Sequence, residues 1–206
     1  MKIAVTVFLS LATLAPASRT EMIRNEKVIA TEEVLRPAAI ESSGEGFASV
    51  TVFLSDGSVS IDSKAGKPVA RTVQRGDVIY RRPHDGKIRA EGMKEVRFVR
   101  IEFRGQGSAD VWGGAGLAPN YRLLLENDHA RVYDIRIPAG TREPRHTHHD
   151  RVVVCLSGAQ LRHVLTDGHE EDSTLETGQC LWRRGQTHVG KNIGATDLWV
   201  VAVEPK

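Results

Sequence analysis

Three histidines, His146, His148 and His149, lie within four positions in the stretch EPRHTHHD, which begins at Glu143. In an extended chain alternate side chains share a face, so His146 and His148 would point the same way and His149 would point outward. Two imidazoles that converge on one point can ligate a metal ion. A His-x-His pair is also found in solvated loops, so the pair alone leaves both interpretations open.

An internal duplication bears on this question. Residues 76–82, GDVIYRR, resemble residues 178–184, GQCLWRR, at an offset of 102 positions. The same offset pairs VTVFLS at 50–55 with VVVCLS at 152–157, and VRFVRIE with LWVVAVE near the ends of the two copies. Further upstream, residues 25–38 resemble residues 127–139 with a slip of one residue. A register kept over several separate segments predicts two copies of one structural unit.

The histidines belong to the second copy alone. At the offset of 102, glycine stands at all three positions that correspond to His146, His148 and His188, namely Gly44, Gly46 and Gly86. Framework residues match between the copies and these do not. The imidazoles are therefore not required by the framework, which favours a chemical role.

The elements that must position these side chains are strands. Short alternating or continuous apolar runs bounded by Gly, Pro, Asp and Asn recur along the chain, and helical periodicity is almost absent. We therefore expect an all-β protein whose strands close into sandwiches or barrels. The expected division is a signal peptide at 1–17, a first unit at 18–104, a glycine-rich linker at 105–120 and a second unit at 121–206.

The second copy resembles the cupin family. In the first cupin motif a glycine precedes His-x-His by five residues, as Gly140 does here, and Gly158 closes the apolar run. The second motif is matched by Gly178, then by Gly185, His188 and Asn192 at the family spacing. The resemblance implies two tandem jelly-roll (cupin-type) β-barrels related by internal duplication, with a degenerate first barrel. It also implies a mononuclear metal site with His146, His148 and His188 as ligands.

Two departures from the cupin pattern affect that site. Where the family has a glutamate ligand this chain has Arg151 or Val152, and Arg183 replaces the proline of the second motif. Asp150 is a candidate substitute because it shares the alternating face of the two histidines. Three neutral histidines with open positions suit zinc or iron best, with manganese or nickel as alternatives.

The resemblance leaves two classes of function open: a metal-dependent small-molecule oxygenase or isomerase, and a non-catalytic binder of a small ligand. Whether the protein is an enzyme is therefore undecided. The sequence lacks the Gly-x-Ser-x-Gly and His-Glu-x-x-His motifs of common hydrolases. A net charge of +2 with scattered basic residues disfavours nucleic acid as a partner. A homodimer is one open alternative.

The amino terminus predicts export. Lys2 precedes an apolar stretch at 3–14, and Ala15-Pro16-Ala17 provides the small residues that a signal peptidase accepts before Ser18. The mature protein would then be periplasmic or secreted. A buried first strand is the alternative, and a membrane span is disfavoured because the stretch is short.

Two further sets of residues carry expectations. Cys155 and Cys180 should lie on neighbouring strands, either as two buried thiols or as a disulfide, which an oxidising compartment permits. Paired arginines at 81–82 and 183–184 recur in both copies, which favours a framework role such as salt bridges over anion binding. His163 lies outside both motifs and is expected to be solvated or hydrogen-bonded.

Overall fold

The computed structural model describes residues 17–41, 46–63, 66–105 and 118–206, and within these ranges the regular secondary structure consists of seventeen strands. Nearly all of the predicted signal peptide and residues 106–117 of the predicted linker lie outside the described residues. The described part of the chain contains no helix that is long and apolar enough to span a membrane.

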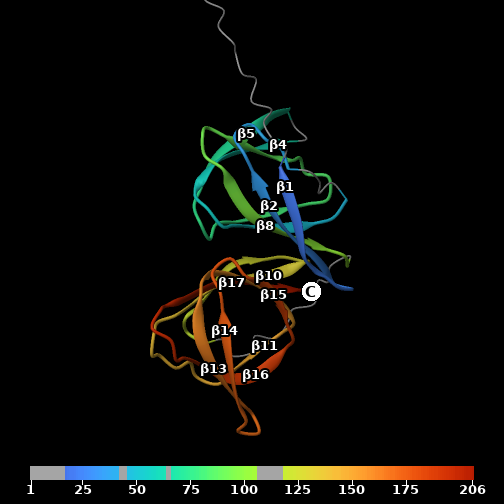
Figure 1. Ribbon diagram of the computed structural model, residues 1–206. Helices are drawn as coiled ribbons and strands as arrows, with labels where there is room; N and C mark the ends of the chain where they lie inside the picture. Colours follow the sequence, from blue (N-terminus) through green and yellow to red (C-terminus); the bar gives the residue numbers. More distant parts are fainter. Residues whose placement is uncertain (1–16, 42–45, 64–65, 106–117) are drawn as a thin grey trace, which may run out of the picture.

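The first half of the chain forms two antiparallel sheets (Figure 1). The larger sheet has the order β1 (Ser18–Arg24), β2 (Val28–Leu35), β8 (Val96–Phe103), β3 (Ser49–Phe53) and β6 (Val78–Arg81). The smaller sheet has the order β5 (Gly66–Val73), β4 (Gly57–Ser63) and β7 (Ile88–Glu91).

The second half repeats this arrangement and has one further strand, β11, in its smaller sheet. Its larger sheet has the order β15 (Cys180–Arg183), β12 (Arg151–Ser157), β17 (Leu198–Pro205), β10 (Ala130–Ile137) and β9 (Tyr121–Glu126). Its smaller sheet has the order β11 (His146–His148), β16 (Gln186–Asn192), β13 (Ala159–Leu165) and β14 (Glu170–Leu175). The molecule is therefore all-β and built from two tandem jelly-roll barrels, as expected.

The duplication is visible strand by strand. Strands β2, β4, β6 and β8 begin 102 positions before β10, β13, β15 and β17 respectively. The backbone agrees, since Gly76 and Gly178 both have positive φ, at 90° and 86°. Positive φ also pairs Ala38 with Gly140, so the offset of 102 continues upstream and the expected slip of one residue is absent there.

The barrels pack against each other through their larger sheets. Strand β12 is buried along almost its whole length because both of its faces are covered. Val152 and Val154 belong to an apolar cluster that also contains Val50 and Ile101 of the first barrel, whereas Val153 faces the interior of the second barrel. Each fully buried valine stabilises the fold by about 1.5 to 3 kcal/mol, so this shared layer holds the two barrels together.

The two cysteines lie on neighbouring strands, as predicted, but no disulfide joins them. Cys180 pairs with Val154 across β12 and β15, so Cys155 is one residue out of register with it. Successive residues of a strand point to opposite faces. Cys155 accordingly faces the interior of the second barrel and Cys180 faces the layer between the barrels, and both are buried free thiols.

The first barrel has a buried ion-pair network in its interior. The Arg100 side chain is fully buried and pairs with Glu33 at 2.8 Å, with Glu41 at 3.0 Å and with Glu102 at 3.2 Å. Arg81 also pairs with Glu41. Buried charges are tolerated when they are paired, so these five side chains fill the barrel without leaving an isolated charge.

Candidate metal centre

Strand pairing places the three predicted ligands together. Strands β11 and β16 are antiparallel, with His146 opposite His188 and Thr147 opposite Thr187. The hydroxyls of these two threonines are 2.8 Å apart, and their hydrogen bond joins the two strands on the outer face. Because alternate residues share a face, His148 lies beside His146 on the inner face. All three histidines are at most 4 % exposed.

The three imidazoles converge through their Nε2 atoms. The Nε2 atom of His146 is 2.9 Å from that of His148 and 3.2 Å from that of His188. Among the described residues this is the one group of three or more histidine, cysteine or acidic side chains whose ligand atoms gather, all within 4.8 Å. Nitrogens bound to one zinc ion at its usual bond lengths are separated by about 3 Å, so the two separations from Nε2 of His146 match a single ion.

Hydrogen bonds fix the outer ring nitrogens. Nδ1 of His146 donates to the carbonyl oxygen of Pro144 at 2.8 Å, which leaves the Nε2 lone pair for the centre. Nδ1 of His188 is 2.6 Å from the amide nitrogen of Gln186, and ligation through Nε2 of His188 requires this amide to turn so that its oxygen accepts from Nδ1–H. Such outer partners orient histidine ligands at metal sites. Burial lowers the pKa of His188 to about 3 and also lowers the pKa of His148, so both rings stay neutral, as ligation requires.

Tyr121 brings an oxygen atom to the same point. Its hydroxyl is 3.2 Å from Nε2 of His146 and 3.2 Å from Nε2 of His148, and burial raises its pKa well above the usual value. One phenolic proton serves a single acceptor, whereas several lone pairs meet here. A cation at the centre would satisfy all of them. Tyr121 lies on β9, outside both histidine motifs, and no spacing rule pointed to it.

Asp150 does not join the histidines. Its carboxylate accepts a hydrogen bond from the backbone N–H of Gly185 at 2.7 Å and lies 3.8 Å from Nζ of Lys27. The alternation that would place it on the inner face ends at His148, where β11 ends. The predicted substitute ligand was therefore wrong. His149 is partly exposed and lies outside the histidine group, as expected.

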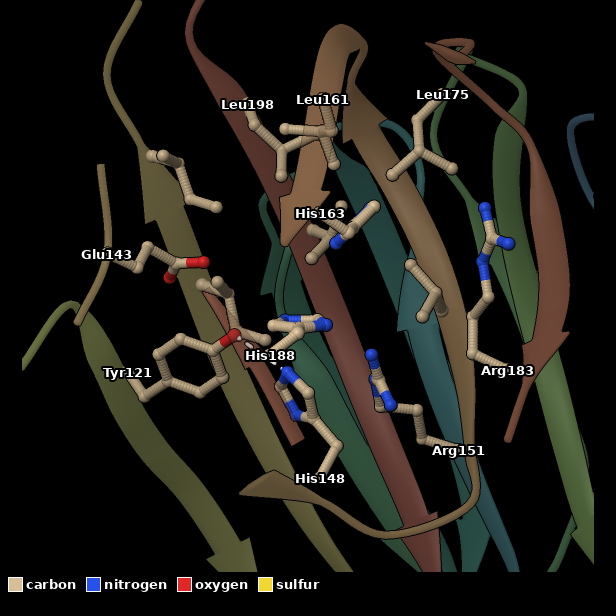
Figure 2. Close-up of a pocket in the computed structure, with 14 residues that line it drawn as sticks. Tyr121, Glu143, His148, Arg151, Leu161, His163, Leu175, Arg183, His188 and Leu198 are labelled. Atoms are coloured by element: carbon tan, nitrogen blue, oxygen red, sulfur yellow. Dashed lines mark hydrogen bonds between the residues drawn. The ribbon is translucent and has the colours of Figure 1, made fainter. Parts of the chain in front are cut away.

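A cavity of about 50 Å³ adjoins the histidines, with one polar and one apolar part (Figure 2). The polar part is formed by Tyr121, Glu143, His148, Arg151, His163, Arg183 and His188. The apolar part is formed by Ile135, Ile137, Val153, Leu161, Leu175, Leu198 and Val200. The cavity therefore suits a small molecule with one polar end.

Glu143 lies on one wall of this cavity, beside the histidines. Its Oε1 accepts a hydrogen bond from the Asn120 amide at 2.8 Å, and its Oε2 is 3.9 Å from Nε2 of His146. Gly190 makes room for it, because a Cβ there would lie 2.4 Å from Oε2. Burial raises the pKa of Glu143, which suits this carboxyl to holding or transferring a proton.

His163 lies closer to the site than the sequence indicated. Its ring centroid is 4.7 Å from that of His188, and its Nε2 is 3.3 Å from the hydroxyl of Ser173. It is hydrogen-bonded, as expected, but it also lines the cavity. Burial lowers its pKa.

The sequence matches no family model and no curated protein. Its fold matches solved structures. AerE from Microcystis aeruginosa shares 15% identity at a TM-score of 0.67, over 94% of this chain and 95% of that one. A cupin 2 conserved barrel domain protein from Leptotrichia buccalis shares 11% identity at a TM-score of 0.60, over 93% of this chain and 90% of that one. Oxalate decarboxylase from Bacillus subtilis, described with Mn(II) centres, shares 17% identity at a TM-score of 0.59, over 91% of this chain and 72% of that one. At such identities the likeness concerns the fold alone.

Proposed function

We propose that this chain, which has the cupin fold in two tandem barrels, binds one divalent metal ion through His146, His148 and His188 and acts on a small molecule there. The observation that carries this proposal is the convergence of three buried Nε2 atoms at distances that fit one ion. The first barrel contains paired arginines and glutamates in its interior, so we assign no ion to it.

Tyr121 completes the donor set. Its hydroxyl oxygen lies as close to the histidine nitrogens as they lie to one another. Three imidazole nitrogens with one phenolic oxygen suit zinc or iron, and manganese or nickel remain the alternatives. Burial keeps the phenol of Tyr121 protonated in the metal-free protein, and a bound cation would have to displace this proton for Tyr121 to supply the anionic ligand that the family draws from a glutamate.

Side chains beside the histidines support a catalytic role for the protein, as an oxygenase or an isomerase. A bound ion supplies Lewis acidity and, if it is iron, redox chemistry. Glu143 can hold or move a proton at Oε2, on the histidine side of the cavity. Glu143 is only 5% exposed, and this burial raises its pKa. A proton-handling group beside a metal site is what an isomerase needs.

The second candidate is a non-catalytic binder of a small ligand. The observation in its favour is the size of the cavity, about 50 Å³, which leaves room for only a few atoms beside the histidines. In that case Glu143 and Tyr121 would fix the orientation of a ligand without transferring a proton to it.

Elemental analysis of the purified protein, followed by titration with zinc, iron, manganese and nickel, tests the site. We expect one ion per chain. Oxygen uptake against a panel of thiols and phenols tests the oxygenase, and proton NMR of the same mixtures without oxygen uptake tests the isomerase. Substrate turnover by wild type and not by Glu143→Gln, with equal metal content, supports catalysis. Failure of all four metals to bind would overturn the proposal.

A further inference from the structure

Two arginines face each other in the wall of the cavity. Arg151 on β12 is the direct cross-strand partner of Arg183 on β15, and both line the cavity beside His188. Like charges directly opposite each other in a sheet are destabilising. Arg151 is also only 6% exposed, and removing a guanidinium from water is costly unless a counter-charge meets it.

Within the described part of the chain, no carboxylate lies at ion-pair distance from either arginine. The hydrogen bonds of Arg151 are long ones, from Nη1 to the carbonyl oxygens of His149 at 3.3 Å and Arg184 at 3.4 Å. Glu143 and Glu204 attract its charge only from a greater distance. The pair of guanidiniums therefore presents donors to the cavity that the protein itself does not saturate.

In the first barrel, the arginine and the glutamate at the corresponding positions form an ion pair. At the offset of 102, Arg81 corresponds to Arg183 and Glu41 to Glu143. In the first barrel, Arg81 and Arg100 both pair with Glu41, so an internal carboxylate neutralises the guanidiniums.

In the second barrel the equivalent carboxylate is held elsewhere. Asn120 binds Glu143, and Figure 2 shows Glu143 across the histidines from Arg151 and Arg183. The cavity lies between the carboxylate and the guanidiniums. The expected framework role of the recurring arginines thus holds for Arg81, which has its salt bridge, and not for Arg183.

We infer that Arg151 and Arg183 bind the carboxylate of a small acid, which takes the role that Glu41 has in the first barrel. A guanidinium presents parallel N–H donors that match the two oxygens of a carboxylate. The rest of the ligand would lie against the leucines of the apolar wall, so the class is a carboxylic acid with a short hydrocarbon part. As a statement about substrate this inference rests on the proposed function, but the binding step itself requires no metal.

Isothermal titration calorimetry with propionate and its neutral isostere propionamide tests the inference, on metal-free and zinc-loaded protein. We expect wild type to bind propionate at least about tenfold more tightly than propionamide. Arg151→Gln and Arg183→Gln should each weaken propionate binding by about tenfold or more and leave propionamide unaffected. Arg162→Gln is the matched control, because Arg162 pairs with Asp172 on the exposed face of the same barrel.

Equal binding of the two probes by wild type, absence of propionate binding, or full propionate affinity in both arginine variants would overturn the inference. Circular dichroism melting checks that each variant folds. Arg183 is only partly buried, so Arg183→Gln carries the test if Arg151→Gln does not fold. Metal content of the same samples is measured separately. Protein that binds metal but shows no carboxylate preference refutes this inference alone, and protein that shows the carboxylate preference but binds none of the four metals refutes the metal proposal alone.

Discussion

His146 and His188 lie directly opposite each other on β11 and β16, and their Nε2 atoms are 3.2 Å apart. This separation is set by backbone pairing, and each Nδ1 is held by a further hydrogen bond. Two ligands placed by one register need no rearrangement to meet an ion. The metal-free protein should therefore keep its fold, and the effects of ligand substitutions should appear in metal affinity before they appear in stability.

Replacing a histidine of the centre should release the metal. In His148→Ala or His188→Ala one of three imidazole ligands is lost, and we expect the metal affinity to fall by more than about 100-fold, beyond the range typical for outer-sphere partners. Chelator competition measures the affinity, and circular dichroism checks the β fold. His149→Ala is the control, because His149 lies outside the cluster and should retain the metal. Wild-type metal content in both ligand variants would contradict the assignment.

Tyr121→Phe should remove one oxygen donor and keep the ring. Loaded with iron(III), the wild-type protein should show a visible phenolate-to-iron charge-transfer band, and the variant should lack it. The metal affinity should fall by about tenfold or more, since a ligand atom is lost. Tyr133→Phe is the control, because Tyr133 packs edge-on against Tyr121 at 6.3 Å and is also buried. A band that persists in Tyr121→Phe would show that the phenol is not a ligand.

The two thiols should be unreactive in the native state. Burial raises the pKa of Cys155 to about 11 and that of Cys180 to about 12, so at pH 8 neither forms appreciable thiolate. Ellman's reagent should label neither cysteine in the folded protein and both cysteines in guanidinium chloride. Titration of fewer than two thiols after denaturation without reductant would point to oxidation and count against the free-thiol arrangement.

Glu41→Gln should destabilise the first barrel. The substitution leaves the buried guanidiniums of Arg81 and Arg100 with one fewer carboxylate, and breaking a buried pair costs about 3 to 5 kcal/mol. Urea unfolding measures the change. Glu21→Gln is the control, since the Glu21–Arg24 pair is exposed and should leave the unfolding midpoint nearly unchanged. Equal unfolding midpoints for the two variants would mean that the network does not stabilise the barrel.

Export remains a proposal from the sequence. If residues 1–17 are a cleaved signal, amino-terminal sequencing of protein from the native compartment should begin at Ser18, and the protein should be found in the periplasm or the medium. Mature protein that begins at Met1 would refute this prediction.

The fold could be predicted because the internal duplication is detectable within a single sequence. Strands such as β8 and β17 match at a constant offset, and the His-x-His pair needs only the alternation of a strand to converge. Tyr121 was missed because it reaches the histidines from β9, 25 residues before His146. Glu143 lies only three residues before His146 and was missed because it belongs to neither histidine motif. Asp150 was wrongly predicted as a ligand because the alternation of side chains along a strand was assumed to continue past His148, where β11 ends.

The apolar layer shared by the two barrels has a consequence for how this protein could evolve. The first barrel has no histidine cluster among its described residues, yet its valines cover one face of the sheet that carries Arg151. Deleting the first barrel would uncover that face and invite aggregation. We therefore expect the two halves to unfold as one cooperative unit, and the half without a histidine cluster to be retained because it keeps the half with the cluster soluble.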